Sequence, residues 1–142
     1  MAVVSNASTA WTGDLFNGSG RTTFDTSGLG TFDVSWKART EPGAGTTTPE
    51  ELIAAAHASC FSMAFSNELA SNGTPPESVN TAAEVTFEPG TGITGIALTV
   101  SAVVVGISEE DFQRIAAAAK EGCPVSGALR ATPITLSATL AA

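Results

Sequence analysis

The 142-residue sequence predicts an α+β fold in a single domain spanning 1–142. The first indication is that short segments with alternating apolar and polar residues follow one another in the sequence. They do not alternate one by one with helices. The expected order is β-β-β-α-β-β-α-(short α)-β. The second indication is composition: 43% hydrophobic residues with 14 Gly and 7 Pro are typical of a globular chain with a sizeable core.

Three strands are expected first, over 8–16, 21–26 and 31–37. The turn former Asn17-Gly18-Ser19-Gly20 separates the first two. In the third, Phe32, Val34 and Trp36 share one face by strict alternation. Arg39 continues the polar face if the strand extends that far.

A long helix is expected to begin after Thr48. Thr48 can be the N-cap, Pro49 suits the first helical position, and Glu51 completes a capping box. The helix should run to about Ala70, with Asn72-Gly73 as its stop. Because apolar residues cover nearly its whole circumference, we expect a central, buried helix.

The second half should add two strands, two helical segments and a last strand. The strands are expected at 79–88 and 93–105, and a helix with acids in its first turn follows Ser108 and ends at Gly122. A short helix or turn over 124–130 leads to a strand over 133–140. The side chains expected on one face of that last strand are Ile134, Leu136, Ala138 and Leu140.

Net charge limits the partners. The charge is −8 with only six Lys and Arg, so a phosphate backbone or an anionic membrane surface would be repelled. No basic segment with an apolar core begins the chain, and no apolar run is long enough for a bilayer. We therefore expect a cytoplasmic protein whose thiols are reduced, except for a transient catalytic disulfide.

The two cysteines are the candidate chemical groups. Cys60 lies inside the long helix, and Cys123 directly precedes Pro124 at the start of another. A thiol attacks as its thiolate, and burial raises a thiol pKa, so a positive group must compensate. As an N-cap, Cys123 would face backbone N–H groups that favour a thiolate. One cysteine is usually a small hydrophobe, but two in distinctive contexts suggest a nucleophile and a partner.

His57 lies one helical turn before Cys60. Its simplest interpretation is a core histidine bonded to a backbone carbonyl, and the alternatives are a thiolate partner or a metal ligand. His57, Cys60 and Cys123 would be only three ligands with no recognised zinc spacing, so no metal is expected. Glu50 suits a helix N-terminus, yet it lies ten residues, about 15 Å, from Cys60. If the two act together, Glu50 comes from a second subunit.

Two segments carry a resemblance to a known family. The chain resembles the OsmC/Ohr family of osmotically inducible and organic hydroperoxide resistance proteins, and its helix sequence resembles the OsmC branch more than the Ohr branch. Trp11-Thr12-Gly13-Asp14 and the last strand also fit. The segments that carry it are Thr48-Pro49-Glu50-Glu51-Leu52-Ile53-Ala54-Ala55-Ala56-His57-Ala58-Ser59-Cys60-Phe61-Ser62-Met63-Ala64 and Gly122-Cys123-Pro124-Val125-Ser126.

The resemblance implies an intertwined homodimer with two β-sheets around central helices, and thiol-dependent reduction of organic hydroperoxides. Cys60 matches the peroxide-attacking cysteine, Cys123 the resolving cysteine and Glu50 the acidic residue of the site. Arg39 matches the arginine position of OsmC-type members, whereas Arg21 lies nearer the Ohr position. No cofactor is implied, and a small dithiol of the lipoyl kind would restore the thiols.

A function of another class is also compatible with the residues. In that alternative, the same apolar helix lines a non-catalytic module that binds a hydrophobic ligand, and the two cysteines only pack. Loss of two thiols per chain on titration with a hydroperoxide discriminates the two functions.

Overall fold

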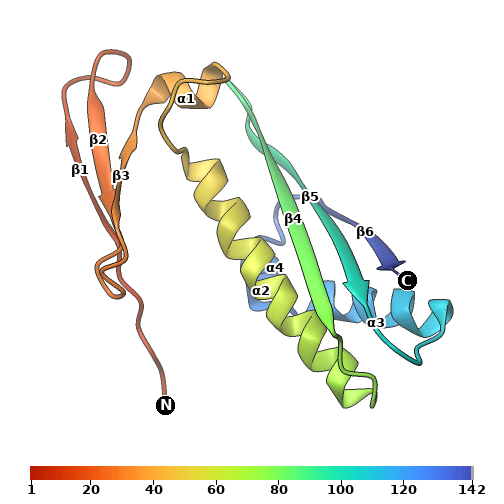
Figure 1. The fold of residues 1–142 in the computed structure, drawn as a ribbon. Coiled ribbons are helices and arrows are strands. Elements are labelled where there is room, and N and C mark those ends of the chain that lie inside the picture. The colour runs from red at the N-terminus through yellow and green to blue at the C-terminus, as the bar shows by residue number, and fades with distance from the viewer. Residues whose placement is uncertain (142) are drawn as a thin grey trace. The chain divides into compact units, whose positions relative to one another are not determined.

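The computed structural model describes residues 1–141 and contains two compact units, Met1–Pro49 and the chain from Glu50 onward, which are considered in turn (Figure 1). The single domain over 1–142 stays a prediction. The α+β class is confirmed, with two three-stranded sheets and four helices.

The first unit is an antiparallel sheet followed by a short helix. Its strands are β1 (Ser8–Thr12), β2 (Ser19–Thr23) and β3 (Thr31–Val34), paired in the order β1-β2-β3. The first strand is shorter than expected because the chain already turns at Asp14. The Asp14 carbonyl accepts from the Gly18 N–H at 2.8 Å, and its carboxylate accepts from the Asn17 N–H at 2.8 Å.

The strand predicted over 31–37 is wrong beyond Val34. The chain instead forms helix α1 (Trp36–Thr40), so Arg39 lies on a helix and not at a strand end. Ser35 is the N-cap, and its hydroxyl accepts from the Ala38 N–H at 3.4 Å. A serine cap outweighs three residues of alternation, because it satisfies a backbone donor that a helix start leaves open.

Helix α2 (Pro49–Ser71) opens the second unit and begins where the capping pattern predicted. Gly73, with φ of 82°, follows its end and donates its N–H to the Ala70 carbonyl at 3.0 Å. The prediction of burial all round is wrong for the single chain, because Met63 is 71% exposed. The buried residues lie along one face: Glu50, His57, Phe61, Phe65 and Leu69.

The second sheet joins β4 (Ser78–Glu88), β5 (Gly92–Val103) and β6 (Ile134–Ala141) in that order. β4 and β5 are antiparallel, as their short connection requires, whereas β5 and β6 are parallel. A parallel pair needs a long crossover, and α3 (Glu109–Gly122) and α4 (Pro124–Ala128) supply it. One βαβ unit is therefore present within the α+β fold.

The core of the second unit lies between this sheet and helices α2 and α3 (Figure 1). Phe65 stacks against Phe61 at 5.6 Å between ring centroids and against Phe112 of α3 at 5.4 Å. The face predicted for the last strand is confirmed, since Ile134, Leu136, Ala138 and Leu140 all pack on this core. Within residues 1–141, no helix is both long and apolar enough to cross a bilayer.

Candidate active site

The fold brings Cys60 and Cys123 together although 63 residues separate them in sequence. Their Sγ atoms lie 3.0 Å apart, and both are free thiols. A disulfide bond needs about 2.05 Å, so a shift of roughly 1 Å would join the two sulfurs. Either sulfur can donate the hydrogen bond between them.

Cys123 is held by two helix ends. Its N–H donates to the Ala119 carbonyl at 2.9 Å as α3 ends, and its carbonyl accepts from the Gly127 N–H at 3.0 Å as α4 begins. Pro124 follows at the first helical position, where a missing N–H costs nothing. The prediction that Cys123 is an N-cap is confirmed, and the residue is only 1% exposed.

The two thiols have opposite pKa shifts. Burial raises the pKa of Cys60, and the hydrogen bond and charge of Cys123 raise it further. Burial also raises the pKa of Cys123, but hydrogen bonding from Cys60, from the Ser126 N–H and hydroxyl and from the Val125 N–H outweighs it, so the net pKa is lowered. Neither N–H makes a well-formed cap bond, so their effect is mainly that of oriented dipoles.

A cavity of about 330 Å³ opens onto Cys60. Cys60 is half-buried and lines it, whereas Cys123 is buried and does not. Only one of the lining residues is charged, and that one is the carboxylate Glu68. The other residues of the lining are Met63, Ala64, Asn67, Ala119, Gly122 and Pro124. The cavity thus has mainly apolar walls and no cation to lower the pKa of Cys60.

His57 is fully buried, but its partner is not the expected carbonyl. Its Nε2 lies 2.7 Å from the Ser126 hydroxyl of α4, and its Nδ1 has no hydrogen-bond partner among the described residues. Burial lowers the pKa of His57, so the imidazole is neutral near pH 7. Ser126 was not singled out from the sequence, although its place three residues after an N-cap was a usable signal.

The acidic candidate, Glu50, lies far along α2 from Cys60, and the two basic candidates, Arg39 and Arg21, belong to the first unit. Glu50 is buried at the start of α2, ten residues before Cys60 on one continuous helix. In the first unit, the Arg39 guanidinium lies over the Trp36 ring at 5.6 Å. Arg21 pairs with Asp33 at 3.3 Å, and both side chains are about 70% exposed. Within residues 1–141, no three metal-ligating side chains gather.

Fold and site together define a class: an α+β protein with a thiol pair held between a long helix and a helix–helix junction. The chain belongs to the OsmC-like protein family, whose family model matches residues 42–137. The resemblance seen in the sequence is thereby confirmed.

Relatives and solved structures agree with this membership. The chain is 42% identical over 124 residues to the peroxiredoxin OsmC of Escherichia coli (strain K12) and to that of Shigella flexneri, covering 85% of this chain and 86% of theirs. An organic hydroperoxide resistance protein OsmC from Legionella pneumophila has a TM-score of 0.70 and 26% identity, covering 98% of this chain and 100% of that one. An OsmC-like protein from Mycoplasma pneumoniae, at 14% identity and full coverage of both chains, shares the fold with a TM-score of 0.75.

Proposed function

We propose that this protein is a cysteine-based peroxidase that reduces organic hydroperoxides, and hydrogen peroxide less well. The observation that carries the proposal is the difference between the surroundings of the two thiols. Cys60 lines a cavity, and the Cys123 sulfur lies 3.0 Å from the Cys60 sulfur, outside that cavity. The names of the relatives, peroxiredoxin OsmC and organic hydroperoxide resistance protein, support the same activity.

In the proposed reaction, the Cys60 thiolate attacks the distal peroxide oxygen. The O–O bond breaks, an alcohol leaves after taking up a proton, and Cys60 becomes a sulfenic acid. Cys123 then condenses with it to a disulfide and water. An external dithiol of the lipoyl kind reduces the disulfide, so the protein needs no resident cofactor. The apolar cavity walls favour an alkyl or aryl peroxide.

A cation must offset the burial that raises the pKa of Cys60. We assign this role to Arg39, with Glu50 orienting its guanidinium. The distance along α2 keeps Glu50 from the Cys60 of its own chain, so the site is completed by a partner chain in a homodimer. The exposed apolar face of α2, which includes Met63, supports such a pairing.

Titration with cumene hydroperoxide tests the function. The reduced protein should lose both thiols of each chain quickly and stoichiometrically, and should turn over when dihydrolipoamide is supplied. Cys60→Ser is the matched control, because serine is nearly isosteric and should leave the circular dichroism spectrum unchanged while abolishing turnover. Thiol loss at the rate of free cysteine would refute the proposal and favour a module that only binds hydrophobic ligands.

A further inference from the structure

Two residues that the proposed reaction does not use form a buried hydrogen bond beside the thiol pair. His57 of α2 is 0% exposed and Ser126 of α4 is 6% exposed, and the His57 Nε2 lies 2.7 Å from the Ser126 Oγ. Ser126 is the third residue of α4, whose N-cap is Cys123. It therefore lies in the first turn after Cys123. The pair therefore connects helix α2 to the turn of α4 that follows Cys123.

The unpartnered nitrogen of His57 indicates which residue donates the hydrogen bond between His57 and Ser126. Nδ1 of His57 has no partner among the described residues. A buried N–H without an acceptor is rarer and more costly than a buried acceptor without a donor. The neutral imidazole is therefore protonated at Nε2, which donates to Ser126. Since the Ser126 oxygen then accepts from His57, its own proton is free to point at the Cys123 sulfur.

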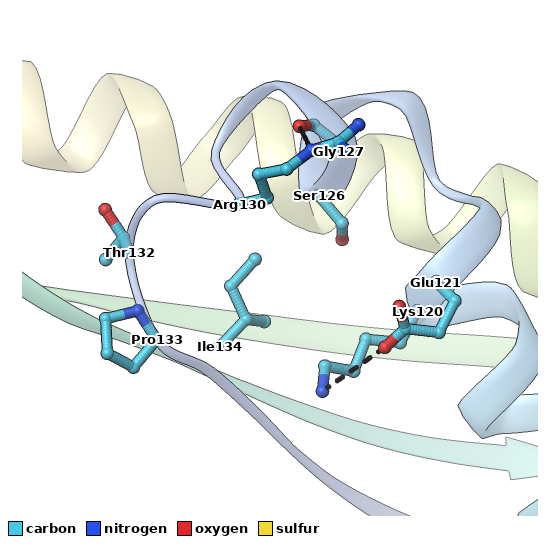
Figure 2. A pocket seen from close by; sticks show the side chains of 8 residues that line it. All are labelled: Lys120, Glu121, Ser126, Gly127, Arg130, Thr132, Pro133 and Ile134. Atoms are coloured by element: carbon cyan, nitrogen blue, oxygen red, sulfur yellow. Dashed lines mark hydrogen bonds and ion pairs between the residues drawn. The ribbon is translucent and has the colours of Figure 1, made fainter.

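Within residues 1–141, no ion pair or hydrogen bond joins a charged side chain to the Cys123 sulfur. Cys60 and His57 of α2 face this region. The charged residues nearest to Cys123 in sequence are Lys120 and Glu121 at the end of α3 and Arg130 after α4, and β5 and β6 carry none. A second cavity of about 390 Å³ is lined by Ser126 together with the two cations (Figure 2). There Lys120 pairs with Glu121 at 3.8 Å, and the Arg130 Nε–H donates to the Gly127 carbonyl at 3.0 Å (Figure 2).

We propose that His57 and Ser126 are positioning residues for the second thiol: His57 orients the Ser126 hydroxyl so that it donates to the Cys123 sulfur and keeps that sulfur a thiolate, ready to attack oxidised Cys60. This inference rests on the proposed peroxidase function for its place in the reaction. The proposed order of hydrogen bonds is His57, Ser126, Cys123, in which the first contact measures 2.7 Å. The lowered pKa of Cys123 agrees with it, because the Ser126 hydroxyl is among its causes.

The step that benefits is disulfide formation. The Cys123 thiolate donates an electron pair to the sulfur of the Cys60 sulfenic acid, the S–S bond forms, and the S–O bond breaks. Hydroxide leaves and takes up a proton to become water. The Cys60 sulfur is reduced from the sulfenic level and the Cys123 sulfur is oxidised, so the electrons balance without a further reactant. A smaller thiolate fraction at Cys123 slows only this step.

The thiolate of Cys123 can be titrated alone in the Cys60→Ser background by its ultraviolet absorbance. Adding Ser126→Ala should raise the Cys123 pKa by about one unit, which is a tenfold smaller thiolate fraction at a pH below both values. Adding His57→Leu should raise it in the same direction. His57→Gln should leave it close to the parent value, because the glutamine amide places an N–H donor near the position of Nε2.

A matched control removes a similar hydrogen bond from the same helix. The Ser62 hydroxyl of α2 lies 2.7 Å from the Thr81 hydroxyl and does not touch either sulfur. Ser62→Ala in the Cys60→Ser background should leave the Cys123 pKa unchanged. An equal shift in Ser62→Ala and Ser126→Ala would overturn the proposal, since it would reflect general loosening of the core. No shift in Ser126→Ala would overturn it as well.

Kinetics in the protein with both cysteines give the second readout. In Ser126→Ala, loss of the first thiol to cumene hydroperoxide should keep its wild-type rate. The disulfide should form about tenfold more slowly, and trapping of sulfenic acid by dimedone should increase. Equal slowing of both steps would contradict a role specific to Cys123. If wild-type protein does not react with the peroxide, the proposed peroxidase function is wrong. The titration of Cys123 still decides whether Ser126 and His57 stabilise its thiolate.

Discussion

Glu50 and Cys60 belong to the same unbroken helix, and the ten residues between them separate their Cα atoms by about 15 Å. A glutamate side chain spans less than half of that distance. The two residues can therefore meet only if a site takes Cys60 from one chain and Glu50 from the partner chain.

Subunit complementation tests the shared site. Cys60→Ser should be inactive, and Glu50→Ala should be about tenfold slower than wild type because the arginine loses its orienting partner. Mixing the two should give heterodimers in which one site carries both changes and the other carries neither. Hydroperoxide reduction should rise above that of either parent once mass spectrometry shows subunit exchange. Exchange without a rise in activity would place both residues in one chain's site, contrary to the helix geometry.

Peptide mapping tests the pairing of the thiols. Because the two sulfurs lie 3.0 Å apart within one chain, hydroperoxide should produce an intrachain Cys60–Cys123 disulfide. In Cys123→Ser, Cys60 should stall as sulfenic acid and proceed to sulfinic acid with excess peroxide, since no thiol condenses with it. Non-reducing electrophoresis separates the alternatives, and disulfides found only between chains would contradict this geometry.

Arg39→Ala and Arg21→Ala form a matched pair for the arginine assignment. Arg39→Ala should raise the Cys60 pKa and slow peroxide reduction roughly a hundredfold, as removal of a single oriented donor commonly does. Arg21→Ala should leave the rate near wild type, and its exposed pair with Asp33 should contribute at most about 1 kcal/mol to stability. Stopped-flow measurements at several pH values give both the pKa and the rate. A larger loss in Arg21→Ala would transfer the role to Arg21.

The buried histidine predicts a pH dependence of stability. Burial holds the pKa of His57 below its usual 6.5, so the unfolded chain binds a proton more readily than the folded one. The free energy of unfolding should therefore fall as the pH drops below about 6.5, until folded His57 is protonated as well. Urea titrations between about pH 7 and pH 5 should show this slope in wild type and not in His57→Gln. The lowered pKa values of Asp14 and Asp111 affect stability mainly below about pH 5 and leave this window clear.

Local signals predicted the helix starts well. Pro49 opens α2, and Ser108 caps α3 by accepting from the Asp111 N–H at 3.1 Å, both as expected. These signals are strong because a few adjacent residues satisfy the open donors of a helix start. The same kind of signal at Ser35 competes with the alternation over 31–37, and that alternation predicts Arg39 on a strand. The parallel pairing of β5 with β6 could not be read locally, because a strand's partner depends on distant residues.

The contacts within the candidate site likewise depend on residues that are distant in sequence. Each cysteine could be singled out from its own helical context, and the two contexts suggested a nucleophile and a partner. Their contact could not be derived from local sequence, because it depends on the packing of α2 against the junction of α3 and α4. His57 was noticed and its burial predicted, yet its hydroxyl partner lies 69 residues away. Ser126 is small, polar and unremarkable in sequence, and its importance depends on that long-range contact.

The parallel crossover between β5 and β6 also sets an order of events for the newly made chain. Cys60 leaves the ribosome well before Cys123, and the element carrying Cys123 is held in place by a connection that closes only when the last strand, Ile134–Ala141, pairs with β5. Closing so long a loop is entropically slow compared with forming the β4–β5 hairpin. We therefore expect the two sulfurs to meet late in folding, so that Cys60 of the newly made chain spends a period without its partner thiol.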